Sequence, residues 1–316
     1  MNTVPTIDLH NIDDHSLSAL DAACRDHGFF LLKNHGLEQQ VAETKAQCEA
    51  FFALPRTQKL AVMRRADNPM GYYDRELTKQ KRDLKEVFDF FARDDQNHEK
   101  RMPWPDHPEA FKATLRSHFL ANSKVAQSVM QLLCRALGIE QTSLDSYFSL
   151  RPTSTARLNY YPSSDPLSES EQQGVTALGD MALHHHTDQG AITLLFQDDA
   201  GGLQAHSRTD GWIDVPPQEG TVVVNIGDLV QVWTNGQYRA ALHRVLATAP
   251  GTSRISIPFF YQPNFETLIA PLSSLGEPVY QPFVCREFIQ GRIDDNYTDL
   301  GGEEDTQIEK YRIVAA

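Results

Sequence analysis

The sequence is poor in cysteine and has no long hydrophobic run. Its four cysteines, Cys24, Cys48, Cys134 and Cys285, are far apart and form no Cys-x-x-Cys pair. This spacing fits neither a zinc ribbon nor a disulfide scaffold, and it favours reduced thiols in a cytoplasmic protein. No apolar run approaches the roughly 18 residues that span a bilayer, and the first residues do not resemble a secretory signal. We therefore expect a cytoplasmic protein that does not enter a membrane.

Basic side chains are also in deficit, with 29 Lys and Arg against 42 Asp and Glu and a net charge of −13. This balance argues against a protein that wraps nucleic acid or lies on anionic lipid. The 41% hydrophobic and 22% charged residues describe an ordinary globular protein. Net charge does not describe a single pocket, which can still hold a cation for an anionic ligand. We expect a small-molecule partner, and nothing in the sequence sets the oligomeric state.

The apolar pattern changes from helical to strand-like along the chain. Apolar residues at helical spacing predict helices over 17–24, 37–52 and 111–137, which end near Gly28, Pro55 and Gly138. From about residue 153 short strands alternate with turns, and the predicted strands include 157–162, 203–206, 212–215, 221–226 and 254–261. These strands predict an α+β fold with a mainly β core, a double-sheeted barrel or jelly roll with helices packed outside it. No low-complexity linker divides the chain, so we expect one continuous body.

Two His-x-acid patterns are candidates for the start of a metal site. The composition alone gives about 1.6 such patterns by chance, so their number carries no information. His107-Pro-Glu109 lies in a proline-broken loop, where a solvated role is favoured. His186-Thr-Asp188 precedes an apolar strand and has a downstream partner, His243, in an apolar setting. Two histidines and one carboxylate are the ligand set of non-heme iron(II) oxygenases.

The neighbouring histidines leave other ligand registers open. His184 and His185 precede His186 directly, but neither begins a His-x-Asp pattern, and His185 has the wrong phase to share a strand face with Asp188. A zinc hydrolase has less support, because the sequence contains no His-Glu-x-x-His helix.

A candidate cation for an anionic ligand lies on the last long strand. Arg254 and Ser256 share one face of this strand, and a guanidinium with a hydroxyl can hold a carboxylate. The alternative is a structural ion pair with an acidic residue elsewhere, since a buried arginine needs a partner. Upstream, Arg157, Asn159 and Tyr161 share a polar face that either borders the same cavity or forms a water-exposed rim.

In the order of these motifs, the chain resembles the iron(II)- and 2-oxoglutarate-dependent dioxygenases of the isopenicillin N synthase-like group. The likeness covers nearly the whole chain, and no single motif carries it. In the first half the matching segments are residues 4–8, 25–36 and 85–90. In the second half they are residues 158–162, 186–188, 202–204, 225–228, 235–236, 243–245 and 254–256.

The resemblance implies a double-stranded β-helix (jelly roll) with flanking helices, an N-terminal leader over 1–105 and a catalytic part over 106–316. It implies that the iron ligands are His186, Asp188 and His243. The residues implied to bind 2-oxoglutarate are Arg254, Ser256, Tyr161 and Asn159. Arg157 is implied as a substrate contact, and Phe260 is implied to pack beside the cavity on the substrate side.

The implied activity is an oxygenase reaction that uses Fe(II), 2-oxoglutarate and O₂. Oxidative decarboxylation of 2-oxoglutarate would be coupled to hydroxylation, desaturation or cyclisation of a small organic molecule. Some relatives use Arg-x-Ser to hold a substrate carboxylate, so one alternative is a family oxidase or cyclase that does not use 2-oxoglutarate. The other alternative is a non-catalytic barrel that binds a metal or a small ligand.

Overall fold

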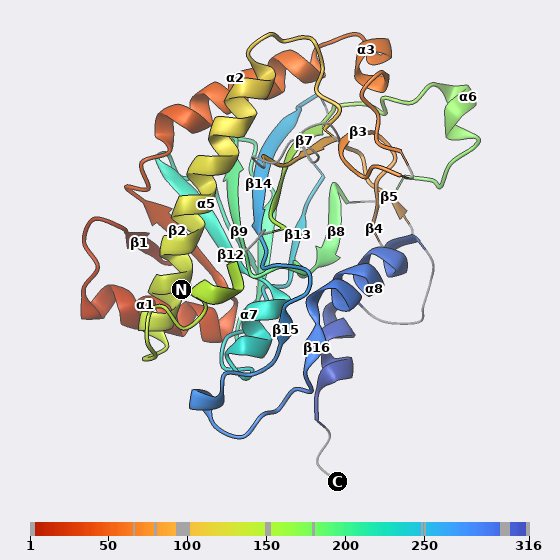
Figure 1. Ribbon diagram of the computed structural model, residues 1–316. Helices are drawn as coiled ribbons and strands as arrows, with labels where there is room; N and C mark the ends of the chain where they lie inside the picture. Colours follow the sequence, from red (N-terminus) through yellow and green to blue (C-terminus); the bar gives the residue numbers. More distant parts are fainter. Residues whose placement is uncertain are drawn as a thin grey trace.

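The computed structural model describes residues 4–65, 67–78, 81–92, 102–148, 153–178, 181–247, 249, 251–297 and 304–313 (Figure 1). The first half of the chain supplies three long helices. They are α1 (Asp14–Asp26), α2 (Glu38–Phe52) and α5 (Phe111–Ala136), and all three lie where the apolar spacing predicts helices. Gly28 and Gly138 follow α1 and α5 with φ of 70° and 77°, a conformation that is unfavourable for residues other than glycine.

The core of the fold is an eight-stranded sheet with the order β1-β2-β12-β9-β14-β7-β6-β3. Its four central strands come from the second half of the chain, and the strands at both edges come from the first half. The bounds are β1 (Thr6–Asp8), β2 (Phe29–Lys33), β3 (Gly71–Tyr73), β6 (Glu86–Phe90), β7 (Thr155–Tyr161), β9 (Ile192–Gln197), β12 (Thr221–Ile226) and β14 (Arg254–Tyr261).

A second sheet of four strands has the order β11-β10-β13-β8. Its strands are β8 (Leu183–His186), β10 (Leu203–Ser207), β11 (Gly211–Asp214) and β13 (His243–Val245). The predicted strands 203–206 and 212–215 form β10 and β11, which pair as a hairpin, and Gly211 has the positive φ, 69°, that this turn requires.

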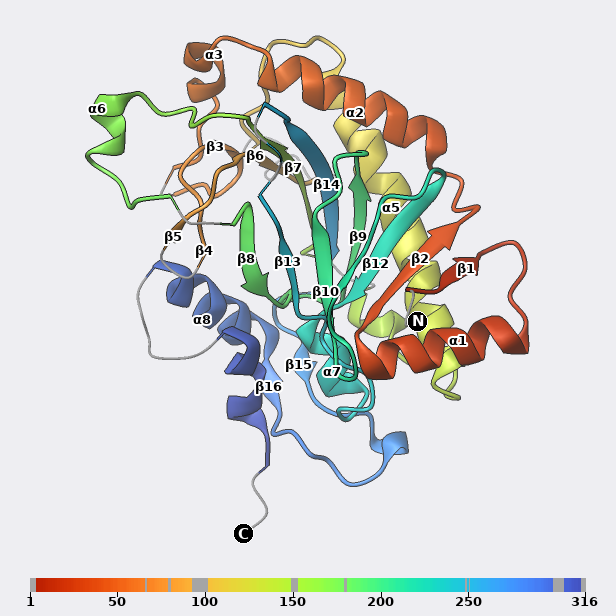
Figure 2. The same cartoon turned by 180° about the vertical axis from the view of Figure 1, so that it is seen from behind.

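The two sheets and the helices form layers (Figures 1 and 2). Helices α2 and α5 cover one face of the large sheet, and the small sheet lies across the other face. Along β14, Ile255, Ile257 and Phe259 belong to the large hydrophobic core, whereas Arg254 and Ser256 point the other way and line a cavity. This alternation follows from the two-residue period of a strand. The prediction of a mixed fold of helices around a large sheet is confirmed.

Helix α7 (Asp228–Trp233) interrupts a region where the sequence predicts only strands and turns. Its apolar residues, some of them β-branched, are all buried. Hydrogen bonds to a distant part of the chain fix its first turn. The Asp228 N–H donates to the Asp188 carbonyl at 2.8 Å and the Leu229 N–H donates to the Gly190 carbonyl at 3.1 Å. Gly227 allows this approach, because a Cβ there would lie 2.2 Å from the Gly190 oxygen.

Helix α8 (Cys285–Tyr297) follows the last strands and lies at one end of the sheets (Figure 2). Among the described residues, no helix has the length and apolar character needed to cross a membrane. The remaining short elements are α3 (Arg56–Leu60), β4 (Leu77–Thr78), β5 (Lys81–Arg82), η1 (Asp145–Phe148), α6 (Glu169–Gln172), β15 (Leu268–Ile269), η2 (Ser273–Leu275), β16 (Phe283–Val284) and η3 (Glu304–Tyr311).

Candidate active site

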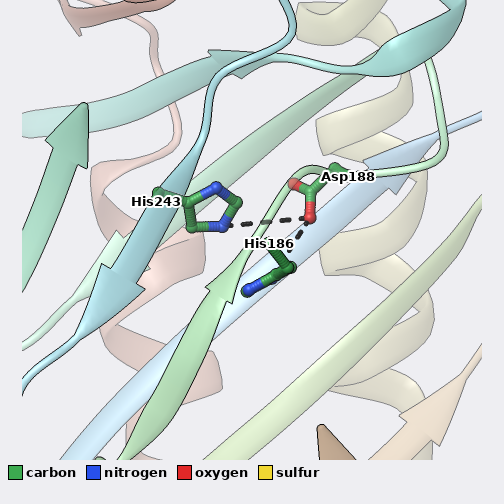
Figure 3. Close-up of side chains that lie close together, drawn as sticks. All are labelled: His186, Asp188 and His243. Carbon is green, nitrogen blue, oxygen red and sulfur yellow. Dashed lines mark ion pairs between the residues drawn. The ribbon is translucent and has the colours of Figure 1, made fainter. Parts of the chain in front are cut away.

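Pairing between β8 and β13 places two histidines side by side. His186 lies directly opposite His243 in the antiparallel register, and their ring centroids are 4.3 Å apart. Asp188 follows two residues after His186. Its Oδ1 is 3.7 Å from Nε2 of His186 and 3.9 Å from Nε2 of His243 (Figure 3). One ligand atom from each residue lies within 4.8 Å of the others, which is close enough to share one metal ion.

Backbone carbonyls orient both imidazole rings. Nδ1 of His186 is 2.8 Å from the His184 oxygen, and Nδ1 of His243 is 2.8 Å from the Ala241 oxygen. A carbonyl oxygen only accepts, so each Nδ1 carries the proton and each Nε2 presents its lone pair towards Asp188. Burial, reinforced by His243, lowers the pKa of His186 to about 3, so this ring is neutral at pH 7. A neutral imidazole is the form that binds a metal.

The Asp188 carboxylate is held through one of its two oxygens. Oδ2 accepts hydrogen bonds from the Thr193 hydroxyl and, at 2.8 Å, from the Asn225 amide. Oδ1 therefore faces the histidines. Burial alone would raise the pKa of Asp188, but His243, His186 and these hydrogen bonds lower it. Two imidazole nitrogens and one anionic oxygen fit a divalent iron ion.

The other candidate ligands lie elsewhere. His184 is buried with Nδ1 3.5 Å from Asp83 Oδ1, and the ring of His185 lies 6.3 Å from the ring of Trp212. His107 and Glu109 are in the loop before α5, where Glu109 is exposed. Within the described part of the chain, only His186, Asp188 and His243 form a group of three metal-ligating side chains.

A cavity of about 720 Å³ opens beside the three residues. One end lies between the two sheets, where strands β7 and β14 pair with Arg254 opposite Tyr161 and Ser256 opposite Asn159. All four side chains line the cavity, and the Asn159 amide donates to the Ser256 hydroxyl at 3.2 Å. Phe260 lines the same cavity from further along β14.

Arg254 is 1% exposed, and within the described part of the chain its hydrogen-bond and ring contacts are with neutral groups. Nε donates to the Gly201 carbonyl at 2.9 Å, Nη2 is 3.4 Å from Gln197 Oε1, and the guanidinium carbon lies 5.0 Å from the centre of the Tyr161 ring. Nη1 is buried without a hydrogen-bond partner, and no carboxylate of the described residues lies within 4.0 Å of the guanidinium. The alternative of a structural ion pair therefore has no support in the described residues.

Arg157, by contrast, already has carboxylate partners. Nε and Nη2 donate to the two carboxylate oxygens of Asp89 at 2.7 and 2.9 Å, and Nη1 donates to Glu76 at 3.1 Å. Asp89 lies opposite Arg157 in the β6–β7 register. Of the two alternatives for this polar face, the cavity border agrees with the structure, since Arg157 lines the cavity and its side chain is only 20% exposed. The sequence did not predict Glu76 or Asp89 as partners, because they come from a distant part of the chain.

Sequence reasoning also missed other cavity-lining cations, among them Lys85 and Arg292. Lys85 begins one of the segments that resemble the family, residues 85–90, and this was the one available signal. Arg292 lies on α8, where no motif marks it. Its guanidinium donates to the Thr187 carbonyl at 2.8 Å and to the Thr187 hydroxyl at 3.2 Å, between two of the candidate metal ligands.

Comparisons with known proteins agree with this geometry. Residues 152–263 match the model of the 2OG-Fe(II) oxygenase superfamily, and residues 4–107 match that of the non-haem dioxygenase in morphine synthesis N-terminal family. Homoarginine-6-hydroxylase 2-ODD-233 of Oryza sativa subsp. japonica is 30% identical, over 93% of this chain and 97% of the relative. The chain belongs to the 2OG-Fe(II) oxygenase superfamily. 1-Aminocyclopropane-1-carboxylate oxidase 1 of Malus domestica is 31% identical, over 92% and 91% of the two chains.

Solved structures of this superfamily share the fold. A full-length Neurospora crassa protein in complex with alpha-KG and thymine is 27% identical with a TM-score of 0.78, over 93% of this chain and 97% of that one. JOX2 in complex with 2OG, Fe and JA is 24% identical with a TM-score of 0.82, over 98% and 89%. The protein is an Fe(II)- and 2-oxoglutarate-dependent dioxygenase, so the predicted family, enzyme class and cofactors are confirmed.

Proposed function

We propose that His186, Asp188 and His243 bind the Fe(II), and that Arg254 and Ser256 hold the distal carboxylate of 2-oxoglutarate, with Asn159 and Tyr161 beside them. The unpaired Arg254 carries this proposal. A buried guanidinium with a free Nη1 and no nearby carboxylate among the described residues is incomplete until an anion arrives. The 2-oxoglutarate dianion supplies that anion.

Bound Fe(II) supplies the activation of O₂ that couples decarboxylation of 2-oxoglutarate to oxidation of a small organic substrate. The residues of this chain supply position and surroundings. His186 and His243 present their Nε2 atoms, and Asp188 presents one anionic oxygen. Around the cosubstrate end, the lining side chains Leu195, Leu203 and Val245 exclude water, which strengthens the charge-assisted bonds to Arg254.

The substrate occupies the opposite part of the cavity, where Phe260 contributes an aromatic surface and Arg157 a cationic one. We assign the two sheets to a double-stranded β-helix, with a leader over 1–105 and a catalytic part over 106–316 in one continuous body. The four free, buried cysteines suit a reducing, cytoplasmic location. The acidic balance supports a protein without a nucleic-acid partner.

Anaerobic titration with Fe(II) and 2-oxoglutarate tests the clamp. The wild type should develop a visible metal-to-ligand charge-transfer band, and Arg254→Met should need at least about tenfold more 2-oxoglutarate to reach the same intensity. Arg244→Met is the matched control, because Arg244 stacks 4.1 Å from the Trp212 ring and does not line the cavity. An unchanged requirement in Arg254→Met would place the cosubstrate elsewhere.

A further inference from the structure

Lys85 is a buried cation on the wall of the cavity. It lies in the short connection between β5 and β6, and its side chain is only 4% exposed yet lines the cavity. Nζ is 2.9 Å from Asp83 Oδ2, and Asp83 is itself fully buried. Burial alone would lower the pKa of Lys85, but Asp83 and Glu76 raise it above its ordinary value. The side chain is therefore an ammonium ion at pH 7.

The Asp83 pair leaves donor capacity on Lys85. An ammonium group has three N–H donors. Among the described residues, Asp83 is its one carboxylate within 4.0 Å and no further hydrogen bond is made. Arg157 beside it uses three of its five N–H donors on Asp89 and Glu76. Both cations line the cavity, and together they have open donors.

The donors belong to the same cavity as the candidate metal site. Lys85 and Arg157 line this cavity together with His186, Asp188 and His243. A group bound in the cavity can therefore contact both cations next to the candidate metal site.

The lining of the cavity is predominantly cationic, although the whole chain carries −13. Its described charged residues are Arg64, Arg65, Lys85, Arg157, Arg254 and Arg292 against Glu76, Asp89 and Asp188. Asp83 and Asp228, which pair with Lys85 and Arg292, are not among the lining residues. The cavity surface therefore opposes a cationic substrate and favours an anionic one.

Apolar side chains occupy other parts of the same cavity. They include Met70, Leu77, Phe260, Phe265 and Ile289. Such a surface suits the hydrocarbon or aromatic body of a ligand, whereas the polar wall suits one charged end.

We propose that Lys85, with Arg157 alongside, binds a carboxylate of the primary substrate, so that the substrate is a small organic acid with an apolar body. This assignment rests on the proposed function, because it concerns the substrate part of the same cavity. A carboxylate accepts charge-assisted hydrogen bonds from the open N–H donors. The corresponding neutral amide accepts weaker hydrogen bonds from the same donors.

The test uses the full chain loaded with Fe(II) and saturating 2-oxoglutarate under anaerobic conditions. The probes are benzoate, phenylacetate and 3-phenylpropionate, each paired with its primary amide, and binding is measured by titration calorimetry. We expect at least one acid to bind about tenfold or more tightly than its amide. Equal affinities, tighter amides, or no binding by any of the three acids would overturn the assignment.

Three variants identify the residue responsible. Asp83→Asn with Lys85→Met removes the buried pair together, so that no single charge is left unpaired, and the acid preference should disappear. Lys85→Arg should keep the preference. Lys81→Met, which changes an exposed lysine outside the cavity, should also keep it. Retention of the full preference in the double variant contradicts the assignment.

The charge-transfer band separates this inference from the proposed function. A wild type without the band would contradict the 2-oxoglutarate site itself, whatever the acids do. An acid that abolishes the band has displaced 2-oxoglutarate at Arg254, and such binding counts against Lys85 as its site. The expected result is a retained band in the wild type and all three variants, with loss of acid preference in the double variant alone.

Discussion

The orientation of the Asp188 carboxylate depends on two neutral side chains, Thr193 and Asn225, which both bind Oδ2. Thr193→Val keeps the shape of this buried residue but removes the hydroxyl. We expect the variant to bind Fe(II) about 10- to 100-fold more weakly, because the carboxylate loses one of its two anchors. The measurement is an anaerobic Fe(II) titration with excess 2-oxoglutarate. Thr193→Ser, which retains the hydroxyl, should bind like the wild type, and equal loss in both variants would exclude this role.

His118 on α5 makes stability sensitive to acid. The residue is fully buried against the Phe196 ring, and neither ring nitrogen has a partner among the described residues. Burial lowers the pKa of His118 to about 3. Below pH 6.5 the unfolded chain binds a proton at this residue and the folded chain does not. The free energy of unfolding therefore falls as the pH drops from 6.5 towards 3.

His118→Phe should remove this part of the acid sensitivity. Between pH 7 and pH 5 the free energy of unfolding should fall by about 2 kcal/mol more in the wild type than in the variant. Urea unfolding of metal-free protein at both pH values measures the difference, and comparing the two values cancels any constant change in packing. His15→Ala, at an exposed position of α1, should lose as much as the wild type. Equal losses in wild type and His118→Phe would contradict the prediction.

At the scale of elements, α8 supports the segment that contains two of the proposed metal ligands. Arg292 binds the carbonyl and hydroxyl of Thr187, and its Nη1 is 3.3 Å from Asp228. We expect Arg292→Gln to weaken Fe(II) binding about tenfold, because the residue between His186 and Asp188 loses its support. The same Fe(II) titration checks this. Arg286→Gln is the control on the same helix, since Arg286 pairs with exposed Glu266. An equal loss of Fe(II) affinity in both variants would indicate a general destabilisation of α8 and contradict this role of Arg292.

The elements that the sequence predicted are those with strong local patterns. Helices α1, α2 and α5 have apolar stripes and marked ends, and β14 alternates over its whole length. Helix α7 escaped prediction because its first turn depends on carbonyls from residues 188 and 190 rather than on its own sequence. Local propensity is a weak guide where tertiary hydrogen bonds decide the conformation.

The residues of the candidate site likewise fall into those that a local pattern predicts and those that depend on distant contacts. The three proposed metal ligands and Arg254 lie in short motifs whose spacing and order are visible in the sequence. The partners of Arg157 are not visible in this way. Glu76 and Asp89 reach Arg157 across 81 and 68 residues, and only the pairing of β6 with β7 brings Asp89 opposite it. Such contacts depend on which strands pair in the folded chain, and no local pattern in the sequence shows that pairing.

At the scale of the whole molecule, the two parts of the chain share one sheet. Strand β2 pairs with β12, with Leu31 opposite Val223, and β6 pairs with β7, with Asp89 opposite Arg157. A chain restricted to residues 106–316 would expose the edges of both inner strands and part of the large core. We therefore expect that fragment to aggregate or remain unfolded. The full chain should unfold in urea as one cooperative transition, with superimposable curves from tryptophan fluorescence and circular dichroism. A soluble, folded fragment that forms the charge-transfer band, or two separate transitions in the full chain, would show that the parts fold independently.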